Sequence, residues 1–387
     1  MLTASRVRVL EELIRSGKTS RAELARKTGL SRPTISSIIE ALIAEGIVEE
    51  LGEGPSAGGK RPILLRLNPR YGFVLGFDVG GTTITGGLKD LAGRLLAQRT
   101  VTASDPAEGA SVLAKVEELA CELMTAAGVP QSRLLAIGLG SPGIVDPETH
   151  ETSNTTNIRG WDDLRVVHRL ASRFRVPVLA DNDVNMAARA ELRFGHGRRH
   201  RSFVFVAIGT GIGAGIVIDG TLHFGTGGAA GEIAQMLLDR DALAEIYREK
   251  GYLETIVAAP GIRKEAARTA GPGAAALDVP DIFDADRRGV PWARALIDRV
   301  VLTLGMAVAN IVCILAPEVV VLGGGVAAGN ERLRAGVEEV VYQSVLRPVP
   351  VVLTELGREA GMLGAAQMAL EHVYARLAHG EALEQAT

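Results

Sequence analysis

The chain has few cysteines and lacks export and membrane signals. Its 387 residues include two cysteines, Cys121 and Cys313, and neither stands in a CxxC pair. We therefore expect two core thiols in a reducing cytoplasm, without disulfides. The first residues, MLTASRVRVLEELIRSG, lack the apolar centre of a signal peptide. Uncharged apolar runs stay shorter than the roughly 18 residues that a membrane span needs, so no membrane partner is expected.

Length and composition predict a multi-domain globular protein. Hydrophobic residues make up 47% and charged residues 22% of the chain. A chain of this length is expected to form two or three compact units. Residues 1–70 hold 12 Lys and Arg against 8 Glu, a net charge of +4, and the remainder holds 30 against 37, so the total is −3. A basic head on an acidic body favours a nucleic-acid-binding module, although a solvated surface has the same balance.

The first seventy residues predict a helix-turn-helix. Ser20 and Glu23 form an S-x-x-E capping pattern, and Gly29 stands where a helix would stop. After a second cap at Ser31, the next helix carries an apolar face: Ile35, Ile38, Ile39, Leu42 and Ile43. Its other face carries short polar side chains beside an arginine, which suit entry into a DNA major groove: Arg32, Thr34, Ser36, Ser37 and Glu40. Such patterns also occur in proteins that never touch DNA.

A predicted wing follows these helices. The stretch IVEELGEGPSAGGKRPILLRLNP reads as a strand, a Gly/Pro turn and a strand. Lys60 and Arg61 near its tip could reach phosphate or the minor groove. The stretch from Gly52 to Pro62 resembles the wing of repressors in the ROK family, named for repressors, open reading frames and kinases. The resemblance implies a head that binds operator DNA, with no cofactor required.

From Tyr71 onward the pattern changes to α/β, with three strands that each end in a glycine-rich turn. These are FDVGGTT, VAIGTGIG and VVLGGGVA. Glycines let the backbone approach an anion, and Asp78 could hold magnesium through water. Turns of this kind can also serve tight packing alone.

Together the three turns resemble the phosphate loops of the actin, sugar-kinase and Hsp70 superfamily. The resemblance implies a two-lobed actin-like, ribonuclease H-like α/β fold behind an N-terminal winged helix-turn-helix domain. It implies a nucleotide site at Asp78, Gly80, Gly81, Thr82, Gly209, Thr210, Gly211, Gly323 and Gly324. Mg-ATP is a possible cofactor of this site.

The sugar side of the body also resembles the ROK family. AIGLGSPGIVDPET, TTNIRGWDDL and LADNDVNMAARAE match its GxPGxVD, N-x-x-G-W and Asn-Asp elements. The resemblance implies that Asp183 is the catalytic base. It implies sugar binding by Asn182, Glu232, Gln235, Glu254 and Asn157. For Asn157, a loop asparagine that satisfies backbone groups is an equal alternative.

The zinc motif of the family is lost. The family pattern is GEIGH followed by C-x-C-G-x-x-G-C-x-E, and four ligand positions here hold Gln235, Glu245, Tyr247 and Tyr252. Glutamine and tyrosine are poor zinc ligands, so we expect no zinc and no metal ligands among these residues. The stretch ALAEIYREKG is expected to be helical and to pack in place of the metal.

The predicted domains are residues 1–70 for the head, 71–180 with 356–387 for the first lobe, and 181–355 for the second. Three hypotheses remain. The first is a sugar-responsive regulator, most simply a repressor, that binds operator DNA and a sugar or sugar phosphate as a homodimer or homotetramer. The second is an active sugar kinase with an attached head. The third is a DNA-bound scaffold with a dead cleft.

Overall fold

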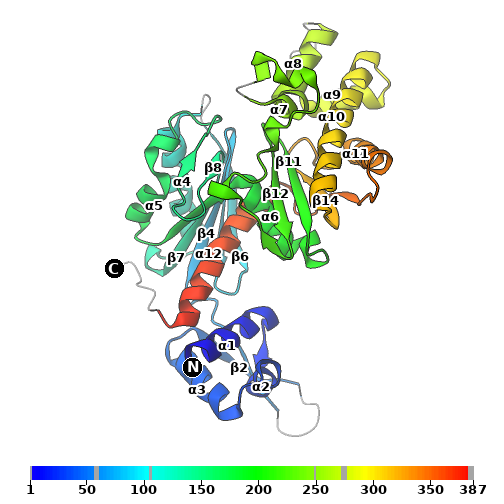
Figure 1. Cartoon of the computed structure of the whole chain (residues 1–387). Coiled ribbons are helices and arrows are strands. Elements are labelled where there is room, and N and C mark those ends of the chain that lie inside the picture. The colour runs from blue at the N-terminus through cyan, green and yellow to red at the C-terminus, as the bar shows by residue number, and fades with distance from the viewer. Residues whose placement is uncertain (1, 56–60, 104–106, 248–249, 272–276, 382–387) are drawn as a thin grey trace. The chain divides into compact units, whose positions relative to one another are not determined.

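The computed structural model describes residues 2–55, 61–103, 107–247, 250–271 and 277–381 (Figure 1). These residues divide into two compact units. Unit 1 comprises residues 1–139, 155–180 and 365–387, and unit 2 comprises residues 140–154 and 181–364. This division differs from the predicted lobes, because residues 140–154 group with unit 2 and the last helix is shared between the units. The head does not separate from unit 1, so its predicted boundary at residue 70 stays a prediction.

The head has the predicted helix-turn-helix and wing, preceded by one further helix. Its elements are α1 (Leu2–Ser16), β1 (Thr19–Ser20), α2 (Arg21–Thr28), α3 (Arg32–Ala44), β2 (Val48–Glu53) and β3 (Ile63–Leu67). The Ser20 hydroxyl accepts the Glu23 N–H at 3.3 Å, and Gly29 ends α2 in the left-handed region with a φ of 70°. Ser31 caps α3 in the same way through the Thr34 N–H. The strands form a sheet in the order β1-β3-β2.

The rest of unit 1 is a five-stranded sheet with helices. The strand order is β10-β7-β4-β5-β6, and β4, β5 and β6 are joined as antiparallel neighbours. The elements are β4 (Phe73–Val79), β5 (Thr83–Asp90), β6 (Leu95–Thr102), α4 (Gly109–Ala126), β7 (Leu134–Ser141), α5 (Val166–Phe174), β10 (Val178–Asn182) and α12 (Ala360–His379).

Helix α12 lies very close to the strands of this sheet. A Cβ on Gly138 would stand 1.9 Å from the carbonyl oxygen of Ala365, and one on Gly76 would stand 2.4 Å from the Ala366 nitrogen. Only glycine fits at this contact. The C-terminal half of α12 packs against the head. Leu370, Val373 and Leu377 share one apolar cluster with Val9 and Leu13 of α1.

Unit 2 has a second five-stranded sheet, in the order β13-β12-β11-β14-β15. The pair β11–β12 is antiparallel, whereas β11–β14 and β14–β15 are parallel. Its elements are β8 (Ile144–Val145), β9 (Thr152–Ser153), α6 (Asp183–Phe194), β11 (Phe203–Ile208), β12 (Ile212–Ile218), β13 (Thr221–Leu222), α7 (Tyr252–Val257), α8 (Ala259–Ala270), α9 (Val279–Arg287), α10 (Pro291–Leu315), β14 (Val319–Gly323), α11 (Glu331–Ser344) and β15 (Val351–Leu353).

Helix α10 is the long apolar helix of unit 2. It is long and apolar enough to cross a membrane, but 61% of its most apolar window is buried inside the protein. Core helices of globular proteins can be as long and as apolar, so the length and composition of α10 are weak evidence for a membrane span. One expectation about this helix was wrong. Cys313 is exposed on α10 and is not a core thiol, whereas Cys121 on α4 is half-buried.

The segment between Ala242 and Gly251 also differs from its prediction. Instead of a helix, its described residues form two 3-10 turns, the end of Arg240–Leu243 and Glu245–Tyr247. Leu243 and Ile246 are 70% and 77% exposed. Because these apolar side chains have no surface to pack against, the segment gains little from the periodicity that stabilises an amphipathic helix.

Candidate functional site

The Asn-Asp pair stands where β10 ends and α6 begins. Asn182 caps α6, since its Oδ1 accepts the N–H groups of Val184 at 2.9 Å and Asn185 at 3.3 Å. Its Nδ2 donates to the Gly143 carbonyl at 2.9 Å. This contact uses one of the two amide hydrogens. The Asn182 side chain is therefore fixed, and it holds Asp183 in the first turn of the helix.

Asp183 has the protonation behaviour of a base that works near neutral pH. Burial raises its pKa to about 6, the N–H of Val184 opposes this by donating to Oδ1 at 2.8 Å, and the charges of Glu232 and Asp181 raise the pKa further. A carboxylate tuned in this way accepts a proton more readily than an exposed one.

Glu232 and Glu254 lie in the same electrostatic environment as Asp183. Burial raises the pKa of both glutamates, and the charge of Glu232 also raises the pKa of Glu254. We name Asp183, Glu232 and Glu254 the carboxylate cluster. The structure thus brings together three of the predicted sugar-site residues in unit 2. Carboxylate oxygens accept hydrogen bonds, and neighbouring sugar hydroxyls donate them.

The second glycine-rich turn is joined to this cluster. Glu254 Oε2 accepts the N–H of Ile212 at 3.3 Å, directly after the GTGIG turn. A Cβ on Gly211 would stand 2.8 Å from the same oxygen. The predicted phosphate turn and a predicted sugar ligand are therefore in direct contact.

In the glycine-rich turns of unit 2, Gly209 and Gly325 border open space. A Cβ built on Gly209 or Gly325 meets no atom within 4 Å. Thr210, between the strands β11 and β12, is exposed. Gly323 and Gly324 close the end of β14, where Gly324 has a φ of 83° and packs against the Ile208 carbonyl. Gly209 and Gly325 therefore leave room for a phosphate, whereas Gly324 allows close packing against Ile208.

The remaining predicted nucleotide residues lie in unit 1. Asp78 is near the end of β4, and the turn after it is closed by the Gly80 N–H, which donates to the Thr83 carbonyl at 2.9 Å. Thr82 is exposed in this turn. Asn157 lies against the same turn, because a Cβ on Gly81 would stand 3.0 Å from the Asn157 carbonyl oxygen. Asn157 is therefore a neighbour of the first phosphate turn, and its sugar-binding role stays a prediction.

The segment that lost its zinc ligands is held by a side-chain hydrogen bond. The Tyr252 hydroxyl donates to Asp239 Oδ2, while Asp239 Oδ1 accepts the Ala242 N–H at 3.1 Å. The rings of Tyr247 and Tyr252 meet edge to face with centroids 5.0 Å apart. We name Asp239 and Tyr252 the tyrosine clasp. Burial and the bond to Asp239 raise the pKa of Tyr252 to about 12, so the hydroxyl stays a donor.

The sequence alone does not predict the clasp. Tyr252 is identified there only as a replaced ligand position, and no local pattern singles out Asp239. A tyrosine in place of a buried ligand does signal a need for a hydrogen-bond partner. Gln235 and Glu245 are exposed. Within the described ranges, no group of three or more His, Cys, Asp or Glu is arranged to hold a metal ion.

The predicted DNA-binding face is on α3. Arg32 and Ser37 are exposed, and Thr34 and Ser36 are partly buried. The Thr34 and Ser31 hydroxyls are 2.8 Å apart, so Thr34 also supports the helix cap. Arg61 lies at the start of the returning wing strand, 3.9 Å from Glu53. Lys60 lies outside the described residues.

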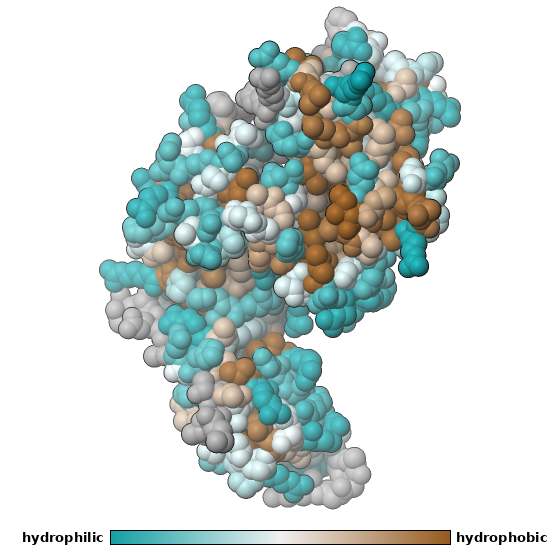
Figure 2. Space-filling view, viewed as in Figure 1, coloured by the Kyte–Doolittle hydropathy of each residue, from teal (hydrophilic) through white to brown (hydrophobic). Residues whose placement is uncertain are grey.

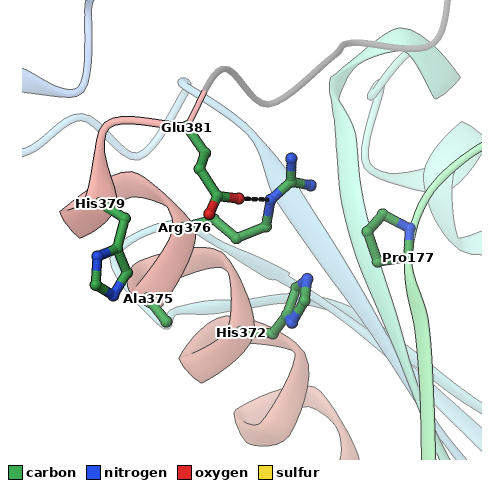
Figure 3. Close-up of a pocket in the computed structure, with 6 residues that line it drawn as sticks. All are labelled: Pro177, His372, Ala375, Arg376, His379 and Glu381. Carbon is green, nitrogen blue, oxygen red and sulfur yellow. Dashed lines mark hydrogen bonds and ion pairs between the residues drawn. The ribbon is translucent and has the colours of Figure 1, made fainter. Parts of the chain in front are cut away.

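A separate hollow of about 430 Å³ lies beside α12 in unit 1 (Figure 3). Pro177 borders it on one side, and the C-terminal part of α12 supplies the others: His372, Ala375, Arg376, His379 and the following Glu381. Arg376 Nε donates to Glu381 at 2.9 Å, so the arginine of the hollow is already paired. None of the predicted site residues lines it.

Comparison with known proteins agrees with this geometry. The ROK family model matches residues 74–372, and a winged helix-turn-helix DNA-binding model matches residues 2–49. The xylose repressor of Bacillus spizizenii is 27% identical over 372 residues, which cover 94% of each chain.

Two solved structures share the fold. The ROK hexokinase of Thermus thermophilus has a TM-score of 0.66 and 32% identity, covering 78% of this chain and 99% of its own. A ROK family transcriptional regulator, a homologue of the E. coli MLC protein, has a TM-score of 0.81 over 99% of both chains at 24% identity, which shows the common fold. The α/β sugar-kinase fold with an N-terminal winged head is confirmed, and the chain belongs to the ROK family.

Proposed function

We propose that this protein is a sugar-responsive transcriptional repressor of carbohydrate-utilisation genes, working in the cytoplasm as a homodimer or homotetramer. The winged head binds operator DNA, and the carboxylate cluster binds a sugar or sugar phosphate. One observation carries the proposal. A head with an exposed polar face on α3 and a set of three electrostatically coupled carboxylates occur in one chain.

The cluster suits a neutral polyol. Each carboxylate oxygen accepts an O–H, while the second amide hydrogen of Asn182 is left to donate to a sugar oxygen. A carboxylate that a ligand covers without donating to it loses its hydration, so a sugar with hydroxyls at matching positions is favoured over one that lacks them. The name of the Bacillus spizizenii relative makes D-xylose the first sugar to test.

The test is operator binding in the presence of sugars. DNA from upstream of the protein's own gene is titrated by fluorescence anisotropy at fixed salt, with and without D-xylose, D-glucose, N-acetyl sugars and their phosphates. We expect one of these to raise the operator Kd at least tenfold. Glu254→Gln should keep the sugar-free Kd and need roughly tenfold more sugar for the same response. A panel in which nothing binds by calorimetry and nothing changes the Kd would contradict the proposal.

A second candidate function is an ATP-dependent sugar kinase. The raised pKa of Asp183 favours it, because a base is what the attacking hydroxyl needs. The open glycines at 209 and 325 leave room for a phosphate in unit 2. The family resemblance separately makes Asp78 of unit 1 the candidate for holding magnesium. Mg-ATP would supply the phosphoryl group. Sugar-dependent ADP release that is absent in Asp183→Asn would establish this activity, and its absence across the panel would leave a sensor.

A further inference from the structure

Unit 2 carries a compact group of arginines between α6 and β11. Three of them, Arg193, Arg198 and Arg199, are exposed within seven positions of the sequence. Residues 192–218 contain no Asp or Glu. Residues 71–387 hold 30 Lys and Arg against 37 Asp and Glu, so this basic group stands on an otherwise acidic body. We name Arg193, Arg198 and Arg199 the arginine patch.

The backbone that presents the patch is fixed by contacts with α6. Residues His196–Arg198 form a 3-10 turn directly after this helix. The fully buried carboxylate of Glu191 accepts the backbone N–H of His196 at 2.9 Å. A Cβ on Gly197 would stand 2.4 Å from the Cα of Leu192, so the turn packs closely onto the end of α6. The arginines before and after the turn are therefore held near one another.

The groups around the patch make their contacts with other partners. Glu318 Oε2 accepts the Arg201 N–H at 3.2 Å and lies 3.3 Å from His200 Nδ1. The Arg201 guanidinium donates to the Asp219 carbonyl at 2.9 Å. Across the described ranges, the three guanidinium groups of the patch form no hydrogen bond or ion pair. Their N–H groups are therefore available to an anion from outside the chain.

The patch lies at one end of the unit 2 sheet. Phe203 begins β11 and pairs with Val217 of β12 at this end, directly after the arginines. Ile212, at the opposite end of β12, contacts Glu254 of α7. Figure 2 shows hydrophilic side chains gathered over the end of the sheet that lies away from α7 in Figure 1. The patch is thus separate from the carboxylate cluster.

The chemistry of the patch favours DNA as its partner. A guanidinium binds phosphate through two parallel N–H groups and keeps its charge at physiological pH. None of residues 192–202, all of which the structure describes, exposes a large apolar side chain of the kind that anchors a protein to lipid. DNA is also the polyanion that the head is proposed to bind. Attachment to the head raises the local concentration of DNA around the rest of the chain.

We propose that the arginine patch binds phosphates of the DNA that flanks the operator. The inference rests on the proposed function, because the head brings the DNA to the chain. Phosphate contacts carry no sequence information. The patch therefore adds affinity and helps to position the duplex, while the choice of bases stays with the head.

The test is the salt dependence of DNA binding by the full chain, measured by fluorescence anisotropy. Each phosphate contact contributes about 0.9 to the slope of log Kd against log salt concentration. We expect the combined variant Arg193→Ala, Arg198→Ala, Arg199→Ala to lower this slope by about 2 to 3 and to raise the Kd at least tenfold at about 50 mM salt. The DNA carries roughly 20 base pairs on each side of the operator, which extend it by about 70 Å per side. On the operator without flanks, the variant should bind as the natural protein does.

The matched control is the combined variant Arg287→Ala, Arg288→Ala, Arg294→Ala, which removes three exposed arginines of unit 2 where α9 meets α10. It loses the same charge and should keep the natural slope. Circular dichroism and urea unfolding establish that both variants are folded. An unchanged slope in the patch variant would overturn the proposal, and an equal loss in the control would do the same. So would binding to anionic lipid vesicles that the patch variant loses while its DNA binding stays natural.

Failure of the proposed function would give a different result. Upstream DNA that binds no more tightly than a scrambled duplex, or that no sugar releases, would contradict the regulator. The difference in slope between the natural protein and the patch variant would still test the patch on either duplex, because phosphate contacts do not depend on sequence.

Discussion

Glu254 and Ile212 join the two kinds of site predicted in unit 2. Glu254 Oε2 accepts the Ile212 N–H at 3.3 Å, and Ile212 directly follows the glycine-rich turn. The carboxylate that is expected to hold a sugar is therefore also a backbone support of the turn that is expected to face phosphate. Removing the charge and removing the acceptor should have different effects.

Glu254→Gln keeps an oxygen that can accept the Ile212 N–H but removes the charge. We expect its free energy of unfolding to stay within about 1 kcal/mol of the natural value, while sugar affinity falls roughly tenfold, because charged acceptors bind hydroxyls more strongly. Glu254→Ala should lose both. Calorimetric titration with the sugar found by operator release measures the affinity. Glu265→Gln, a surface glutamate paired with Arg268, is the control.

Asp183→Asn should stabilise the protein at neutral pH. The folded-state pKa is raised to about 6, above the unfolded value, so the charged form is disfavoured by folding. The stability that the Asp183 carboxyl contributes is fully present below its pKa in the unfolded chain. It is lost as the pH rises through the folded-state pKa of about 6. The variant avoids that loss. We expect a gain of roughly 1–2 kcal/mol at pH 7.5, after allowance for partial exposure, that shrinks toward pH 4.

Urea unfolding of the natural protein and of Asp183→Asn at several pH values measures this difference. Asp163→Asn, an exposed aspartate in unit 1, should show no comparable gain. A gain that does not change with pH would mean that the Asp183 carboxyl is not the group responsible.

Tyr252→Phe should loosen the segment that carries Glu254. The variant keeps the ring contact with Tyr247 and deletes the donor to Asp239. Asp239 Oδ2 then lacks the hydrogen bond from Tyr252, which lowers the free energy of unfolding by about 1–2 kcal/mol. We expect amide hydrogen exchange at residues 239–247 and 251–258 to speed up about tenfold. Tyr247→Phe, which leaves the clasp in place, should exchange at the natural rate; equal acceleration in both variants would contradict the role of the clasp.

Arg6→Ala should weaken the attachment of the head to α12. Arg6 Nε donates to the Leu377 carbonyl at 3.0 Å, and its guanidinium pairs with Glu45 beyond the end of α3. The side chain is 15% exposed, so about 1–2 kcal/mol is expected to be lost. Thermal unfolding should show an earlier transition of the head. Arg26→Ala, on the exposed side of α2 and 3.7 Å from the exposed Glu23, should unfold as the natural protein does.

Local signals carried the predictions that the structure confirms. The serine caps and the glycine stop of the head act within one turn of helix, so their effect can be predicted from neighbouring residues. The paired strands around glycine turns are likewise short-range patterns. The roles given to Asp183, Glu232 and Glu254 came from resemblance, and they stay predictions even though the three side chains share one environment.

The features that sequence did not predict depend on distant partners. Arg6 and Leu377 are 371 positions apart, and nothing near either one indicates their bond. Asp239 becomes informative only when Tyr252 is seen beside it. The exposed Leu302 and Ile314 of α10 are as apolar as its buried residues, so periodicity could not separate a core position from an exposed one.

The shared apolar cluster of the head and α12 limits how this protein can be shortened. A chain cut before Tyr71 would lose the side chains that cover Leu370, Val373 and Leu377, and three large apolar residues would face water. The resulting sugar-binding fragment is expected to aggregate unless those positions are made polar. Exchanging heads between relatives would meet the same barrier, so heads and last helices should be transplanted as matched pairs.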